Sequence, residues 1–141
     1  MYEVILYYYF NTIKHPEQFA KQHKQYCKDL SIKGRIYISS EGINGTAAGT
    51  PEQMAQYKAD LRAIPGFENT EFKTDESDYI PFSKLICKVR EEIVSLHVDG
   101  VDPKDGGNHL SPAEWRRVME EQDDYVMIDV RNNYESKIGH F

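Results

Sequence analysis

Cysteine is scarce in this sequence, which holds two in 141 residues, Cys27 and Cys87. Two thiols so far apart provide neither a disulfide framework nor the cysteine clusters of a zinc site. The histidines form no H-x-x-H or H-E-x-x-H pattern, so the sequence gives no support for a bound metal. We therefore expect no metal, and a cytoplasmic protein with reduced thiols is the simplest interpretation.

Long apolar runs are also missing. No stretch approaches the roughly 18 apolar residues of a membrane span, and the N-terminal sequence MYEVILYYYFN lacks the basic start of a secretory signal. We therefore expect no membrane contact.

A positive excess of charge is missing as well, because the formal net charge is −6 at pH 7. The charge is uneven, with a small positive balance in residues 1–62 and a negative one in residues 99–141. A polyanion responds to the local patch, so the acidic total weakens the argument for RNA binding without deciding it.

The most distinctive pattern that is present runs from Gly34 to Gly49, GRIYISSEGINGTAAG. Its first residues alternate between polar and apolar, which predicts a half-buried strand. The run EGING at 41–45 predicts a tight turn, because glycine and asparagine reach positive φ easily, and a return strand follows. An Asn-Gly pair usually marks only a hairpin. Here Glu41 and Asn44 add a carboxylate and a carboxamide that a plain turn does not need, so we predict a site.

Residues 1–97 otherwise alternate between strand and helix patterns. We expect strands at 2–10, 67–74, 85–90 and 93–96, helices at 16–30 and 50–64, and an acidic loop at 75–82. Two helices would cover one face of a mainly antiparallel sheet in a split βαβ, ferredoxin-like arrangement of the α+β class. Both cysteines fall on the inner faces of their elements, which favours unreactive core thiols.

Basic side chains recur at positions that can share a surface. Lys33 and Arg35 open one predicted strand, and Lys88 and Arg90 lie on the same face of another. A solvated surface is the ordinary explanation, and contact with RNA phosphates is the functional one. The tyrosines at 7–9 are likewise either core residues or platforms on which bases stack.

The C-terminal part changes character. Residues 98–109 are rich in glycine, proline and aspartate, which is typical of a linker. A capped helix begins after Ser111, and the apolar run 125–128 is typical of a buried parallel strand. Asp129 and Arg131 follow at its carboxyl end, where α/β folds keep their sites. About 30 residues with so few elements cannot bury a core of their own.

These motifs in this order, EGINGT after a G-x-I-x-I strand and then EEIVSL, GVDP, LSPAEW and IDVRNNYE, resemble the rhodanese-related tRNA uridine hydroxylases. The resemblance implies an acylphosphatase-like (ferredoxin-like) domain at 1–97, a linker at 98–109 and the truncated start of a rhodanese domain at 110–141. It implies hydroxylation of C5 of the first-anticodon-position uridine, with tRNA bound through its anticodon arm. Molecular oxygen and an unidentified electron donor are implied too, and no other cofactor is evident.

The resemblance also assigns site residues. Asp129 and Arg131 match the family's D-x-R motif, whereas the reactive cysteine is expected beyond Phe141. Neither Cys27 nor Cys87 can inherit that role, so we expect the fragment alone to be inactive. The residues that we expect to bind RNA are Lys33, Arg35, Glu41, Asn44, Lys88 and Arg90.

Acyl phosphate hydrolysis is rejected, because the loop Asn11–Pro16 has neither the glycine nor the arginine of a phosphate cradle, and Ile38 stands where acylphosphatases carry an asparagine. Rhodanese-type sulfur transfer is an alternative for the whole protein. For the fragment alone, the alternative is a non-catalytic module that binds RNA or protein.

Overall fold

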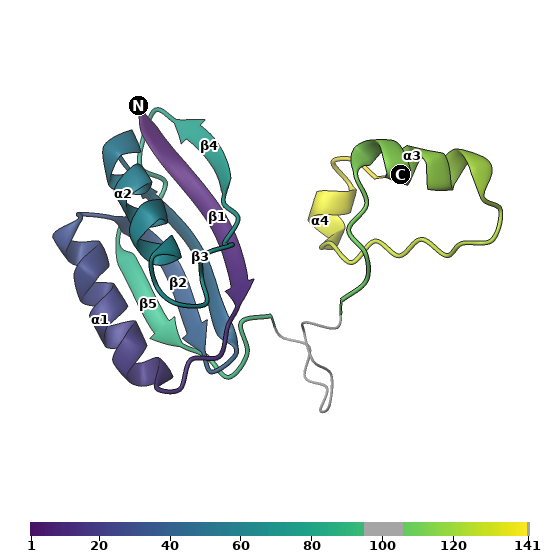
Figure 1. Ribbon diagram of the computed structural model, residues 1–141. Helices are drawn as coiled ribbons and strands as arrows, with labels where there is room; N and C mark the ends of the chain where they lie inside the picture. Colours follow the sequence, from purple (N-terminus) through teal and green to yellow (C-terminus); the bar gives the residue numbers. More distant parts are fainter. Residues whose placement is uncertain (95–105, 141) are drawn as a thin grey trace. The chain divides into compact units, whose positions relative to one another are not determined.

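The computed structural model of the protein describes residues 1–94 and 106–140 (Figure 1). The chain divides into two compact units, Met1–Lys104 and Asp105–Phe141. The linker predicted at 98–109 lies mostly outside the described residues, so the predicted domain boundaries stay a prediction. None of the described helices is long and apolar enough to cross a membrane.

The first unit is a five-stranded sheet with the order β4-β1-β3-β2-β5. Its strands are β1 (Tyr2–Phe10), β2 (Lys33–Ser39), β3 (Gly42–Gly49), β4 (Lys73–Ser77) and β5 (Leu85–Val89). Helices α1 (Pro16–Asp29) and α2 (Pro51–Arg62) lie against one face of the sheet, as Figure 1 shows. This confirms the predicted α+β, ferredoxin-like class. The sheet is mainly antiparallel, as predicted, and β5 lies parallel to β2.

Local chemistry explains where the helices begin. Thr50 caps α2 through a complete capping box with Gln53, and Pro51 occupies the first turn, where its missing N–H costs nothing. Pro16 begins α1 in the same way, although its N-cap residue makes no side-chain bond. Both helices turn apolar residues toward the sheet, and Cys27, Ile36, Ile38, Met54 and Leu61 are among the buried core residues.

The turn between β2 and β3 lies earlier than predicted. β3 already begins at Gly42, so Ser40 and Glu41 form the turn and the prediction of a turn over 41–45 is wrong. Asn44 is instead a strand residue, paired with Tyr8 of β1 and with Tyr37 of β2. Pairing with both neighbouring strands overrides the local preference of Asn-Gly for a turn.

The strand predicted at 67–74 is also wrong. Residues 67–70 turn tightly, with the Phe67 N–H donating to the Ile64 carbonyl and the Thr70 N–H donating to the Phe67 carbonyl, both at 3.0 Å. β4 begins only at Lys73 and takes in 75–77, which belonged to the predicted loop. Of the further strand predicted at 93–96, residues 95–96 lie outside the described residues, and 93–94 are not in a strand.

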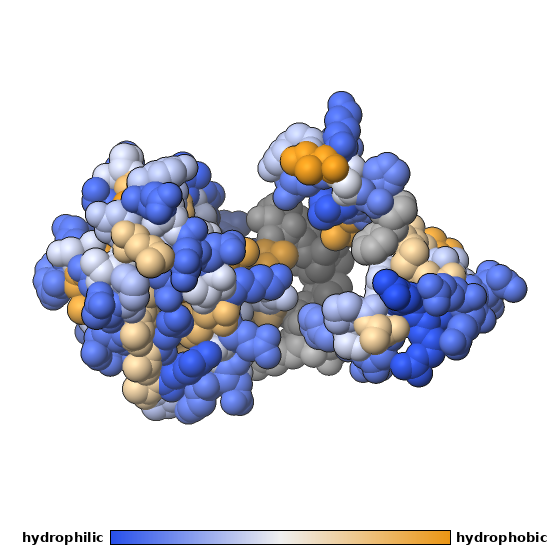
Figure 2. Space-filling model, turned by 90° about the horizontal axis from the view of Figure 1, so that it is seen from above, coloured by the Kyte–Doolittle hydropathy of each residue, from blue (hydrophilic) through white to orange (hydrophobic). Residues whose placement is uncertain are grey.

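The second unit contains helix α3 (Pro112–Glu121), capped by Ser111 as predicted, and the short helix α4 (Asn133–Ser136). The apolar run 125–128 is not a strand, so that prediction is wrong. A buried parallel strand needs neighbours, and no other described segment pairs with this one. Its apolar side chains are exposed, Val126 at 87% and Ile128 at 76%. Figure 2 shows such hydrophobic atoms, in orange, on the surface of this unit.

Candidate nucleic-acid interface

The sheet face that the helices leave uncovered carries most of the predicted site residues. Two rows of residues in register cross it, one formed by Tyr8, Asn44, Tyr37 and Lys88, and the other by Lys73, Leu6, Thr46, Arg35 and Ile86. Lys33 lies farther along β2 on the same side, and Arg90 directly follows β5. We call these two rows, with Lys33 and Arg90, the open face.

Positive charge dominates the open face. Lys33, Arg35, Lys73 and Lys88 occupy strand positions on this side, and among the strand residues Asp75 is the one carboxylate there. Within the described residues, no carboxylate forms an ion pair with Lys33, Arg35 or Lys88. Unpaired cations beside one another attract a polyanion, even though the whole chain is acidic.

Aromatic rings lie among these cations. Tyr8 is 53% exposed, and its ring packs edge-on against Phe10 with 6.2 Å between the ring centroids. The guanidinium of Arg90 lies over the ring of Tyr37, 4.9 Å from its centroid. The structure thus places Lys33 and Arg35 on β2 and Lys88 on the neighbouring strand β5, which Arg90 follows. Tyr37 lies opposite Lys88, and Tyr8 lies in the same row.

The side chains of Glu41 and Asn44 are fixed by hydrogen bonds to one residue, Ile93. The Ile93 N–H donates to Glu41 Oε1 at 2.8 Å, and Asn44 Nδ2 donates to the Ile93 carbonyl at 2.9 Å. Both side chains are half-buried, and Ile93 is only 6% exposed. We call this arrangement the Ile93 clamp. It gives Glu41 and Asn44 a structural task, and their contact with RNA stays a prediction.

The loop after β1 is not an open phosphate cradle. The Asn11 N–H donates to the Glu41 carbonyl at 2.9 Å, and the Ile13 N–H donates to the Ser40 carbonyl at 2.8 Å. These two amides are therefore already used within the protein. Ile38 is completely buried in the core. Both observations support the rejection of acyl phosphate hydrolysis.

Beneath the sheet lies a buried polar network that sequence reasoning missed. The hydroxyls of Tyr7 and Tyr57 share a hydrogen bond, and His23 Nε2 shares another with the Tyr57 hydroxyl at 2.8 Å. Burial lowers the pKa of His23 to about 4, because desolvation penalises the charged imidazolium. The sequence carries no signal that the polar atoms of His23 and Tyr57, which lie on different helices, would meet.

Both thiols are buried, as predicted. Burial raises the pKa of Cys27 to about 12, with the nearby Cys87 adding to the shift. Burial also raises the pKa of Cys87 to about 11, against a smaller opposing effect of Lys24. A reactive cysteine needs an accessible thiolate near neutral pH, and neither Cys27 nor Cys87 meets that requirement. Among the described residues, no group of His, Cys, Asp and Glu could hold a metal ion.

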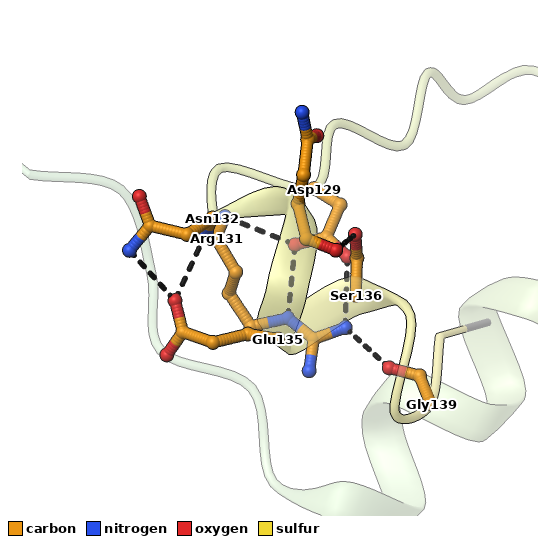
Figure 3. A network of polar contacts seen from close by, with 7 residues as sticks. Asp129, Arg131, Asn132, Glu135, Ser136 and Gly139 are labelled. Atoms are coloured by element: carbon orange, nitrogen blue, oxygen red, sulfur yellow. Dashed lines mark hydrogen bonds and ion pairs between the residues drawn. The ribbon is translucent and has the colours of Figure 1, made fainter.

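In the second unit, Asp129 and Arg131 form a bidentate ion pair (Figure 3). Arg131 Nε donates to Asp129 Oδ1 at 2.9 Å, and Nη2 donates to Oδ2 at 2.8 Å and to the Gly139 carbonyl at 2.8 Å. Hydrogen bonds from Arg131 lower the pKa of Asp129 to about 2. The pair is exposed and fastens its own loop to the segment after α4, and its functional role stays a prediction.

Comparison with known proteins adds three findings. The family model described as UPF0176 acylphosphatase like domain matches residues 2–93. A protein named tRNA uridine(34) hydroxylase from Staphylococcus aureus (strain N315) is 48% identical over 142 residues, which cover 99% of this chain and 44% of the relative. The protein of that name from Shouchella clausii (strain KSM-K16) is 46% identical over 143 residues, with the same coverage. The chain thus spans less than half the length of these relatives.

Solved structures are similar in fold only. The structure titled BlrP1 BLUF aligns with a TM-score of 0.53 at 13% identity, covering 64% of this chain and 65% of the other. A Klebsiella pneumoniae BlrP1 complex with manganese and cy-diGMP aligns with a TM-score of 0.53 at 14% identity, covering 64% of this chain and 24% of that one. At such identity the likeness concerns the fold alone.

Proposed function

Because the chain belongs to the family of UPF0176 acylphosphatase-like domains, we propose that it is part of a tRNA uridine(34) hydroxylase whose first unit binds the tRNA. The observation that carries this proposal is the 48% identity to a protein of that name over 99% of the chain. The cytoplasm, where tRNA is processed, is the proposed location.

The open face supports the binding role. It carries cations without carboxylate partners next to aromatic rings, which is the combination that proteins use to hold RNA phosphates and unstacked bases. The anticodon arm offers both, because its stem presents phosphates and its loop presents bases that are not paired. Arg35 and Lys88 lie in adjacent rows on neighbouring strands, so they can contact successive phosphates of one strand.

The chemistry requires more than this chain provides. Converting a C5–H bond of uridine into C5–OH removes two electrons from the base. We propose molecular oxygen as the oxidant, with one oxygen atom entering the base and the other leaving as water. A separate donor then supplies two electrons and two protons. A cysteine that adds to C6 of the uridine would need an accessible thiolate, and neither Cys27 nor Cys87 provides one.

The test compares two charge reversals in the full-length protein. Arg35→Glu with Lys88→Glu alters the open face, and Lys21→Glu with Lys28→Glu makes the same charge change on the exposed side of α1. Cells lacking the gene are complemented with each variant, and nucleosides from their tRNA are measured by mass spectrometry. We expect 5-hydroxyuridine derivatives to fall with the first pair and to persist with the second.

Three results would contradict the proposal. Unchanged modification by the first pair would remove the open face from RNA binding, and equal losses with both pairs would reduce its role to net charge. Unaltered 5-hydroxyuridine derivatives in cells without the gene would reject the hydroxylase assignment. A thiolated uridine lost in their place would favour sulfur transfer.

A further inference from the structure

We infer that the open face binds an unpaired RNA segment by stacking one base on the ring of Tyr8 and a second on the Arg90–Tyr37 pair. The inference rests on the proposed function, in which RNA is the partner. It goes further by naming the form of RNA that the first unit recognises, single-stranded and not double-helical, and the residues that recognise it.

The first observation is the exposure of Tyr8. β1 has a neighbour on each side, so the ring stands in the interior of the sheet surface and not at an edge. It is nevertheless 53% exposed, and its hydroxyl has no hydrogen-bond partner among the described residues. The contact with Phe10 is T-shaped, so it covers at most one of the two flat sides of the Tyr8 ring. A base has a flat surface of matching size and chemistry.

The second observation is the pairing of Tyr37 with Arg90. Tyr37 lies two strands from Tyr8 in the same row, with Asn44 between them. Two strand spacings correspond to ~10 Å across the sheet, which is within the reach of neighbouring nucleotides in an extended chain. Arg90 covers the Tyr37 ring, and the outer side of a guanidinium plane is itself a surface on which a base can stack.

The third observation is where the charges lie. Lys88 is beside Tyr37 in the same row, and Arg35 is two residues before Tyr37 on β2. Cations therefore lie on two sides of the Tyr37 position, where they can bind the phosphates on either side of a stacked base. The same charges argue against a second copy of the chain as the occupant, because two open faces brought together would place positive charge against positive charge.

A double helix would use this surface poorly. Its bases are stacked on one another, so it presents phosphates and 2′-hydroxyls but no base face. Tyr8 and Leu6, both about half exposed at 53% and 48%, would then contact charged backbone and gain no stacking. The aromatic and apolar part of the open face is explained by a strand whose bases are free.

The experiment measures affinity by fluorescence anisotropy with the 141-residue chain and two labelled probes. One probe is a single-stranded RNA oligonucleotide, and the other is that strand annealed to its complement. The variants are Tyr8→Ala and Tyr8→Phe, and Tyr79→Ala is the control. Tyr79→Ala removes a ring that is 69% exposed but lies outside the strands.

We expect Tyr8→Ala to weaken binding of the single strand about tenfold, as loss of one stacking contact does. Tyr8→Phe keeps the ring and should bind like the original chain, and Tyr79→Ala should change affinity little. Binding of the duplex should be weaker throughout and insensitive to Tyr8. Because about half of the Tyr8 side chain is exposed, Tyr8→Ala should stay folded in the absence of urea, and a retained cooperative urea transition separates lost stacking from lost folding.

Other results would overturn the inference. Equal weakening by Tyr8→Phe would assign the effect to the hydroxyl, and equal loss with both probes would show that base stacking is not what Tyr8 provides. If Arg35→Gln weakens binding but Tyr8→Ala does not, stacking fails while RNA binding stands. If no RNA binds at all, the proposed function itself fails. Self-association that Tyr8→Ala abolishes would assign the face to a second copy.

Discussion

Asn44 donates a hydrogen bond from its carboxamide to the carbonyl of Ile93, 2.9 Å away and 49 residues later in the chain. Glu41 accepts a hydrogen bond from the N–H of Ile93 at 2.8 Å. The backbone N–H and the carbonyl of Ile93 are therefore bound by two different side chains. The side chain of Ile93 also fits over Gly42, where an added Cβ would come within 3.1 Å of Ile93 Cδ1. The EGIN motif therefore fixes the path of the chain after β5.

The first prediction concerns this Ile93 clamp. Replacing Asn44 with Ala removes the donor to the Ile93 carbonyl and should release the segment 91–94 from the sheet. We expect faster amide hydrogen exchange at Ile93, by a factor of about 5 to 10 if the lost bond contributes ~1 kcal/mol. Exchange in the middle of β1 and β3 should not change. The measurement is residue-resolved hydrogen exchange by NMR.

A second variant separates the structural role of the clamp from RNA binding. Glu41→Gln keeps an oxygen that can accept from the Ile93 N–H, so exchange should change less than with Glu41→Ala. If Asn44→Ala weakens RNA binding while leaving exchange at Ile93 unchanged, Asn44 contacts RNA directly and the clamp is not its main task. If Asn44→Ala speeds exchange at Ile93 without any effect on RNA binding, the clamp is the main task of Asn44.

Local chemistry made much of the fold predictable. Thr50, Pro51 and Gln53 are sufficient to place the start of α2, because a capping box depends on residues that are close in sequence. The Asn44-Gly45 pair led to a wrong prediction of a turn for the same reason, since its local preference is a turn. What decides its conformation is β-pairing with Tyr7 and Tyr8, residues nearly 40 positions earlier, which no local pattern reveals.

The candidate site illustrates the same limit. The sequence marked Lys33, Arg35, Lys88 and Arg90 as cations on strand faces, and the structure places those strands side by side. The sequence could not show that β5 pairs with β2 rather than with another strand. Nor could it show that Tyr8 is the exposed member of its tyrosine run while Tyr7 is buried. Strand order decides which side chains meet, and it comes from contacts between distant residues.

The second prediction concerns Gly45, which faces the ring of Tyr7 across the β1–β3 pair. A Cβ added at this position would lie 2.6 Å from Tyr7 Cζ, which is far inside van der Waals contact. Gly45→Ala should therefore lower the free energy of unfolding by about 1–3 kcal/mol, the usual cost of overpacking a core. Urea unfolding followed by tyrosine fluorescence measures it.

Gly107→Ala is the matched control for this change, because an added Cβ at Gly107 meets nothing within 4 Å. It should leave the unfolding curve where it is. If Gly45→Ala is as stable as the original chain, Tyr7 can move aside at no cost. The hydrogen bond between Tyr7 and Tyr57 would then not restrain the ring as the structure indicates.

The third prediction is a pH dependence that arises from His23. Its pKa is about 4 in the folded chain and 6.5 when unfolded, because burial disfavours the charged form. Between these values the unfolded chain binds more protons, so stability rises with pH and is lost as pH falls from 6.5 toward 4. The full loss is on the order of 3 kcal/mol, from ~1.4 kcal/mol per pKa unit.

His23→Asn isolates this contribution, because carboxylates also affect stability in acid. The difference in unfolding free energy between the original chain and the variant should be constant above pH 6.5 and shrink below it, as only the original chain loses stability through His23. Denaturant titrations over a series of pH values provide the data. A difference that stays constant through the whole range would show that His23 does not titrate in the way its burial requires.

The fourth prediction concerns the two thiols. With pKa values of about 12 for Cys27 and about 11 for Cys87, almost no thiolate exists at pH 8, and burial keeps reagents away. Ellman's reagent should therefore react with the folded chain far more slowly than with the chain in denaturant, where both thiols become available. Rapid labelling of either cysteine in the folded chain would mean that its side chain reaches solvent, and that residue would then become a candidate for the covalent step that we place outside this chain.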